Sequence, residues 1–243
     1  GAHTHTGIAV AGATRAAAGL GTQYLRFWGL VRRSPQLDRL HAKVVALAGT
    51  VGTLCVAGLA LALLAGAFDL ARSLVLTGLW GFVVRTYLVV AHRMIPFFTS
   101  SAVPMIDVWR PFWVLWMLLG AVALELAAIW VPLVMSWMGE PAGRGGRAWM
   151  LGLGLMQLAA GSVILWLAFV WGLVQSLSIR LLAMLHLGFL WLGLSFVLAG
   201  VSQLLGLRLG TPVLGLGALH ALTLGCLGSL MLAMVTRVSC GHS

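Results

Sequence analysis

Long apolar runs dominate the pattern of hydrophobic and polar positions along this chain. Six of them approach or exceed the roughly 20 apolar residues that a helix needs to cross a bilayer. Backbone polar groups must be paired inside the segment when it lies in lipid, and this favours helices. The pattern therefore predicts an all-α protein, a polytopic transmembrane helical bundle of about six spanning helices. The predicted helices cover residues 44–68, 74–92, 111–138, 148–174, 181–206 and 212–235.

Composition agrees with this pattern and excludes an ordinary soluble domain. Hydrophobic residues make up 61% of the chain, charged residues make up 8%, and the mean hydropathy is +1.04. Residues 1–43 mix small residues with basic ones, so we expect a basic N-terminal stretch that is cytoplasmic or the remnant of a preceding helix or loop. Residues 44–243 form the predicted transmembrane domain. Because the chain begins at Gly1 rather than at a methionine, we expect it to be part of a longer protein.

Positive charges are unevenly divided between the two sides that the six helices connect. If the N-terminal stretch is cytoplasmic, ten Lys or Arg residues fall on that side and four fall on the other. Cytoplasmic segments carry an excess of such residues, so both ends of the chain are predicted to be cytoplasmic. The net charge of +10 then reflects topology and attraction to anionic headgroups. The sequence lacks the aromatic and basic pattern typical of nucleic-acid binding.

Titratable side chains inside the predicted helices are the main indication of function. Five of the seven histidines lie inside or beside these helices, and an ionisable group at membrane depth suggests a functional site. Arg85 and His186 share a layer about 8 to 10 Å from the inner ends of their helices. Glu125 and His220 share a deeper layer, about 21 to 22 Å from those ends, with Gln157 slightly beyond it. We therefore predict a buried polar relay of Arg85, Glu125 and Gln157, with His220 or Arg85 as the partner of the Glu125 carboxylate.

The histidines are also candidate metal ligands. Two imidazoles on one haem iron bring their nitrogens within about 4 Å of each other. His186 and His220 differ in depth by about 14 Å, so His92, His186 and His242 form the better inner-side group, and one cofactor is the economical expectation. Cys240 and His242 make a Cys-x-His pair, but two ligands are too few for a metal site. The three cysteines form no Cys-x-x-Cys pair, so neither a disulfide framework nor a zinc ribbon is expected.

Four short stretches carry a more specific pattern than any single residue. Residues 92–99 read His-Arg-Met-Ile-Pro-Phe-Phe-Thr, and Pro96 is expected to stop or kink the second helix. Residues 185–193 read Leu-His-Leu-Gly-Phe-Leu-Trp-Leu-Gly, and residues 219–225 read Leu-His-Ala-Leu-Thr-Leu-Gly. Residues 234–243 read Met-Val-Thr-Arg-Val-Ser-Cys-Gly-His-Ser. In this order, the stretches resemble the NnrS family of polytopic bacterial membrane proteins.

The resemblance covers the chain from about Leu74 to its end, and it implies the properties of the family. NnrS proteins are linked to nitric oxide metabolism and are reported to contain haem and copper. The resemblance implies an inner-membrane protein that contributes to tolerance of nitrosative stress or to denitrification-linked metabolism. Family members have more spans than this chain offers, so the chain resembles a C-terminal portion, and the N-terminal half is an expected partner. The residues carried over as cofactor-binding are His92, Arg93, His186, His220, Arg237 and His242, and the four histidines are the candidate metal ligands.

Two other functions remain open from the sequence. A transporter would use Arg85, Glu125 and His220 as a proton or substrate relay, but the inverted repeats typical of such proteins are not detected in the sequence. A structural or assembly subunit would need none of these polar residues at membrane depth. The sequence does not decide whether the protein catalyses a reaction, and it favours a haem- and copper-binding stress protein over both alternatives.

Overall fold

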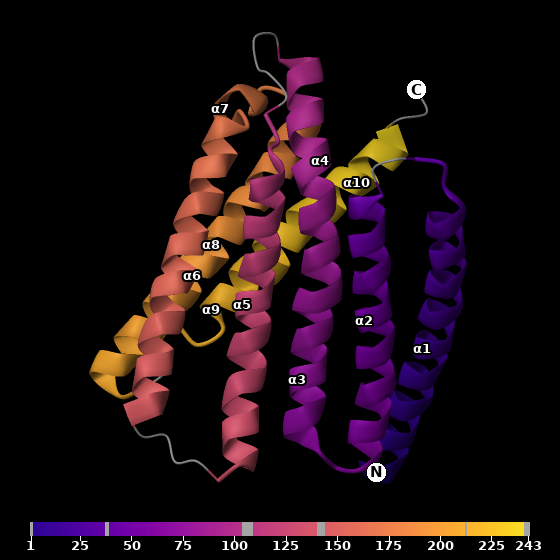
Figure 1. The fold of residues 1–243 in the computed structure, drawn as a ribbon, viewed down its shortest axis with the longest axis vertical. Coiled ribbons are helices and arrows are strands. Elements are labelled where there is room, and N and C mark those ends of the chain that lie inside the picture. Colours follow the sequence, from indigo (N-terminus) through magenta and orange to yellow (C-terminus); the bar gives the residue numbers. More distant parts are fainter. Residues whose placement is uncertain (1, 37–38, 104–108, 140–143, 212, 241–243) are drawn as a thin grey trace. The chain divides into compact units, whose positions relative to one another are not determined.

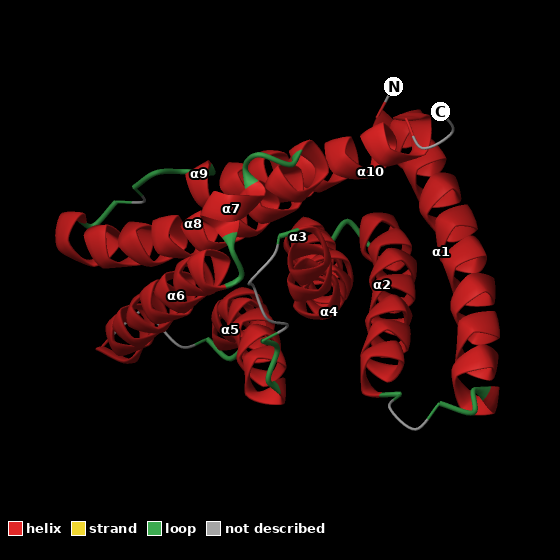
Figure 2. Ribbon diagram, turned by 90° about the horizontal axis from the view of Figure 1, so that it is seen from above, coloured by secondary structure: helices red, strands yellow, loops and turns green. Residues whose placement is uncertain are grey.

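Helices account for every regular element in the part of the chain that the computed structural model describes, which is residues 2–36, 39–103, 109–139, 144–211 and 213–240 (Figure 2). Six of these helices are long and apolar enough to cross a membrane. The predicted fold class, a polytopic transmembrane helical bundle, is therefore confirmed. The six spans are Leu40–Leu64, Phe68–Ala102, Phe112–Trp137, Gly146–Val170, Arg180–Leu209 and Gly217–Val235.

The chain divides into two compact units, each with its own set of helix contacts. The first unit contains Gly1–Ala91 and Glu125–Met138, and the second contains His92–Leu124 and Gly139–Ser243. Helix α4 (Arg85–Ala102) and helix α5 (Phe112–Trp137) are each divided, with one part in the first unit and the other part in the second.

In the first unit, α1 (Ala2–Arg33) runs antiparallel beside α2 (Leu40–Leu64), as Figure 1 shows. The sequence predicts no spanning helix in residues 1–43, because arginines interrupt the apolar positions there. The structure nevertheless forms the 32-residue helix α1. Aromatic rings pack directly against glycines of α2. A Cβ at Gly49 would lie 1.9 Å from Cε1 of Tyr24, so only glycine leaves room for this ring. Tyr24 is thus one contact that aligns α1 with α2.

The second span runs further than its sequence pattern predicts. Helix α3 (Phe68–Gly78), the π-helical segment η1 (Leu79–Val84) and α4 follow one another without a break. The span therefore begins before residue 74 and continues past His92 to Ala102, with Pro96 inside it. Pro96 does not stop the helix. Its missing N–H removes the helical hydrogen bond to the His92 carbonyl, and membrane helices tolerate this because other groups can pair the freed oxygen.

In the second unit, α6 (Arg144–Val170) and α8 (Arg180–Leu209) pack along their length through glycines. A Cβ at Gly161 would lie 2.9 Å from the carbonyl oxygen of Gly193, and a Cβ at Gly200 would lie 2.7 Å from that of Gly154. The two glycines on each helix are seven residues apart, so both pairs meet in one antiparallel register. This contact between backbones fixes the position of α8, which carries His186.

The remaining helices of the second unit are α7 (Leu173–Ser176), α9 (Gly217–His220), the π-helical segment η2 (Ala221–Leu227) and α10 (Gly228–Cys240). Segment η2 and α10 pack against α8. Segments of π-helix are rare in proteins overall, and those that occur are often found at functional sites. Here η1 ends directly before Arg85 and η2 begins directly after His220. Both predicted polar positions therefore adjoin irregular helical backbone.

Candidate functional site

His92 lies in α4 and is fully buried. Its Nε2 is 3.2 Å from the carbonyl oxygen of Pro111, in the segment that leads into α5. A carbonyl oxygen only accepts hydrogen bonds, so Nε2 is the donor, and we assign the neutral ring as the Nε2–H tautomer. The lone pair of His92 therefore lies on Nδ1.

His186 lies in α8 and is also fully buried. Its Nε2 is 3.0 Å from Oγ1 of Thr99, and that hydroxyl donates its one hydrogen to the Ile95 carbonyl oxygen at 2.9 Å. The Thr99 oxygen must then accept from Nε2, which leaves the lone pair of His186 on Nδ1. Among the described residues, this buried Nδ1 has no hydrogen-bond partner. His186 thus keeps an unused electron-pair donor in the interior.

The Trp171 ring lies beside His92, and the Phe189 ring packs on Trp171. The Trp171 ring lies 6.5 Å from the His92 ring in an edge-on arrangement and 5.0 Å from the Phe189 ring, measured between centroids. Trp171 also donates from Nε1 to the Trp109 carbonyl oxygen at 3.1 Å. The side chains of Trp171 and Phe189 are fully buried, so they exclude water from this region. We call the five residues His92, Thr99, Trp171, His186 and Phe189 the buried histidine cluster.

Helix geometry explains how the cluster forms. Thr99 follows His92 by seven residues, so the two lie on one face of α4, about 10 Å apart along its axis. Phe189 follows His186 by three residues and shares its face of α8. The sequence selected both histidines but missed Thr99, Trp171 and Phe189. The seven-residue spacing was the available signal for Thr99.

The other predicted ligands lie apart from the buried histidine cluster or outside the described part of the chain. His220 is exposed at the end of α9. A Cβ at Gly188 would lie 3.2 Å from the Cys226 carbonyl oxygen, and one at Gly225 would lie 2.5 Å from Trp191. This register places His220 level with about residue 195 of α8, about 14 Å along the axis from His186. One metal ion cannot join these two imidazoles directly.

Among Arg93, Arg237 and His242, only Arg93 has a described side chain. Arg93 is exposed on α4. Arg237 lies in α10, but its side chain is outside the described part, as is that of Cys240. His242 lies outside the described residues altogether.

The predicted buried relay is divided between the two units. Arg85 is half-buried and Glu125 is buried, and both belong to the first unit. Gln157 is buried on α6 in the second unit, which also contains His220. Both Glu125 and Gln157 take part in polar or electrostatic contacts. The pairing of Glu125 with His220 or Arg85 stays a prediction.

The described residues do not assemble a complete metal site from protein ligands. No three His, Cys, Asp or Glu side chains gather within that part of the chain. The buried histidine cluster instead supplies imidazole donors. Axial ligation of a haem iron needs only one or two such donors, whereas a closed structural zinc site needs four ligands. The described residues therefore could supply an imidazole ligand to a haem iron, and they do not form a closed metal site.

Comparison with known proteins extends the resemblance seen in the sequence. The chain matches the model of the family described as NnrS protein over residues 4–243, so the likeness predicted from Leu74 onward also includes α1 and α2. No curated protein and no solved structure matches the chain. Because the match covers nearly its whole length, the chain belongs to the NnrS family.

Proposed function

We propose that this multi-pass membrane protein binds haem and copper in the bacterial inner membrane and contributes to tolerance of nitric oxide, often beside denitrification. Its six spans and its family support the coarse assignment. The proposed orientation places both ends of the chain in the cytoplasm, following the excess of Lys and Arg on that side. The finer assignment depends on the buried histidine cluster.

The observation that carries the proposal is the buried Nδ1 of His186. Burying an unpaired polar atom lowers the stability of the folded protein by about 1 to 3 kcal/mol, so a functional role for this atom would explain why it is kept. Metal-ligating histidines characteristically donate their other ring N–H to a carbonyl, carboxylate or water, which fixes the tautomer. His92 and His186 both donate from Nε2 in this way, to Pro111 and Thr99. Their tautomers suit metal ligation through Nδ1.

In this proposal His186 or His92 ligates the metal centre, and His186 is the first candidate because its Nδ1 has no partner among the described residues. A haem iron or copper ion held there would supply the centre that binds nitric oxide. Thr99 orients the His186 ring, and Trp171 and Phe189 keep the surroundings dry. Nitric oxide is small and apolar, so it can reach a buried centre through lipid without a polar entrance. Exposed Arg93 remains a candidate partner for a cofactor carboxylate.

The test is to purify the chain in detergent and to record oxidised and reduced absorption spectra with iron and copper analysis. His186→Ala is expected to remove the haem band or the copper, and His92→Ala to weaken it. His41→Ala is the matched control, because His41 is also a buried histidine but lies on α2 in the first unit. Unchanged metal and haem content in both cluster variants would show that the ligand assignment is wrong.

A cellular measurement connects the cluster to its proposed role. Cells that depend on this protein should lose growth in the presence of a nitric oxide donor when they carry His186→Ala, and should keep it with His41→Ala. If the wild-type protein holds neither haem nor metal, the relay of Arg85, Glu125 and His220 becomes the function to test, through substrate uptake into vesicles.

A further inference from the structure

A second feature of the molecule lies in the first unit, which contains none of the residues proposed as cofactor ligands. An open cavity of about 440 Å³ lies between α1 and α2. Thr22, Gln23 and Arg26 supply its polar wall. Phe27, Leu30 and Val45 are among its apolar lining. The volume is within the range of small-molecule sites, about 300 to 1,000 Å³, and the mixed lining suits an amphipathic ligand.

Arg26 lies at an unusual depth for a charged side chain. Gly49 meets Tyr24, and a Cβ at Gly21 would lie 3.4 Å from Thr53, which sets the register of α1 against α2. Arg26 is therefore level with about residue 48 of α2, about 12 Å beyond the start of that spanning helix. A cation at this depth needs a counter-charge or must extend toward the membrane surface. Arg26 is exposed, and no hydrogen bond or ion pair joins it to the residues that the structure describes.

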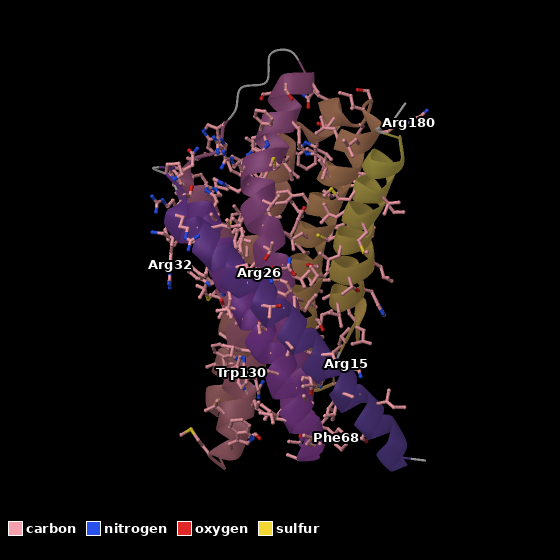
Figure 3. All side chains as sticks on the ribbon, turned by 90° about the vertical axis from the view of Figure 1, so that its right-hand side faces the viewer. Arg15, Arg26, Arg32, Phe68, Trp130 and Arg180 are labelled. Carbon is pink, nitrogen blue, oxygen red and sulfur yellow. The ribbon has the colours of Figure 1, made fainter. Side chains whose placement is uncertain are left out.

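The surroundings of the cavity are strongly basic. Between Thr22 and Val45 the sequence carries five basic residues and one acidic residue. Arg32 stacks over the Trp28 ring at 5.9 Å, and Arg39 donates to the Arg32 carbonyl oxygen at 3.2 Å. Figure 3 shows Arg15, Arg26 and Arg32 following one another along α1. This end of the α1 and α2 pair therefore attracts anions to the membrane surface.

We propose that this cavity binds an anionic phospholipid. The phosphate contacts the Arg26 guanidinium, which can form paired hydrogen bonds with it, and Thr22 and Gln23 supply further hydrogen bonds. An acyl chain lies along Phe27, Leu30 and Val45. A free phosphate ion would leave this apolar wall uncovered, whereas a lipid at the interface covers both walls at once. The site is independent of the haem and copper proposal.

The experiment measures lipid retention by native mass spectrometry of the purified chain, titrated separately with phosphatidylglycerol and phosphatidylcholine. Wild-type protein should prefer phosphatidylglycerol. Arg26→Gln should reduce that preference about fivefold, the loss expected when one basic residue that attracts an anionic headgroup is removed. Arg26→Lys should keep most of it. Arg15→Gln is the matched control, because Arg15 lies eleven residues earlier on the same face of α1 and outside the cavity.

A second variant tests the cavity itself without changing charge. Leu30→Trp adds an indole to the apolar wall and should weaken phosphatidylglycerol binding while leaving the helical circular dichroism signal unchanged. Equal preference for the two lipids in wild-type protein would overturn the proposal, as would equal losses in Arg26→Gln and Arg15→Gln. Displacement of phosphatidylglycerol by inorganic phosphate at equal concentration would also overturn it, because the site would then bind the free anion. Haem and metal content should not change in any of these variants.

Discussion

Both units contain a ring N–H that donates a hydrogen bond to a threonine hydroxyl, but the chemical result differs between them. In the first unit, Trp130 donates from Nε1 to Thr77, whose hydroxyl donates to the carbonyl oxygen four residues earlier. Trp28 and Thr50 repeat the arrangement. In the second unit the ring is that of His186 and the threonine is Thr99, whose hydroxyl again donates to the carbonyl oxygen four residues earlier.

The difference between the rings explains the outcome. Indole has one polar nitrogen, so a single hydrogen bond to threonine satisfies it completely. Imidazole has two, and the same bond leaves Nδ1 of His186 with an unused lone pair. The first unit therefore uses its ring–threonine contacts for packing and structure. The second unit holds a potential ligand rigidly in an apolar interior.

The largest expected effect compares how the two units pack glycine. Gly200→Ala places a Cβ 2.7 Å from the Gly154 carbonyl oxygen, and backbone cannot move aside without shifting a helix. We expect it to lower the free energy of unfolding by about 3 kcal/mol. Gly49→Ala in the first unit has the Tyr24 ring as its nearest obstacle, so Tyr24→Ala should restore part of its loss. Thermal unfolding in detergent measures all three variants, and equal losses without rescue would contradict this contrast.

A pair of tryptophan variants compares the stability that one buried ring contributes in each unit. Trp171→Phe removes the hydrogen bond to the Trp109 carbonyl oxygen and leaves space in a fully buried position, so we expect a loss of about 2 kcal/mol. Trp130→Phe removes a partly buried interhelical hydrogen bond and should cost about 0.6 kcal/mol. Unfolding midpoints of the two variants give the comparison. A larger loss for Trp130→Phe would reverse our ranking of the two units.

Glu125 tests whether the first unit also contains a buried polar group that needs a partner. Glu125→Gln keeps hydrogen-bonding capacity, whereas Glu125→Leu removes it, so the amide variant should be more stable by about 1 kcal/mol. Expression level and thermal stability of the two variants provide the measurement. Equal values would count against a hydrogen-bonding partner for the Glu125 carboxylate, the role that the sequence assigns to His220 or Arg85.

Thr99→Val, like Trp130→Phe, has the smallest expected effect on stability, about 0.6 kcal/mol, because it removes one interhelical hydrogen bond. Its informative readout is the tautomer of His186. Nitrogen-15 chemical shifts of histidine-labelled protein should show the Nε2–H form in wild type and a mixture in Thr99→Val. An unchanged spectrum would mean that Thr99 does not fix the ring. Thr77→Val is the matched control, since it alters the equivalent contact in the first unit.

Much of the fold was predictable because hydropathy depends on residues summed along the chain. The six apolar runs gave the all-α membrane fold, and the motifs around His92, His186 and His220 indicated the NnrS family. The helix over residues 2–33 was not predicted, because Arg15 and Arg26 interrupt its apolar pattern while its inner face still packs on α2. Pro96 was expected to stop or kink its helix. It does not stop the helix, which continues to Ala102, because a membrane helix can pair a freed carbonyl elsewhere.

The sequence by itself determined which side chains are costly at membrane depth, and so it selected His92 and His186. Only the tertiary structure decided which nitrogen of each ring carries the hydrogen. That outcome depends on Thr99 meeting His186 from another helix and on the Pro111 carbonyl oxygen facing His92. Contacts of this kind depend on helix faces that lie far apart in the chain, here held in register by glycines between α6 and α8. Hydrophobic periodicity defines each face, but the partner of that face is set by packing.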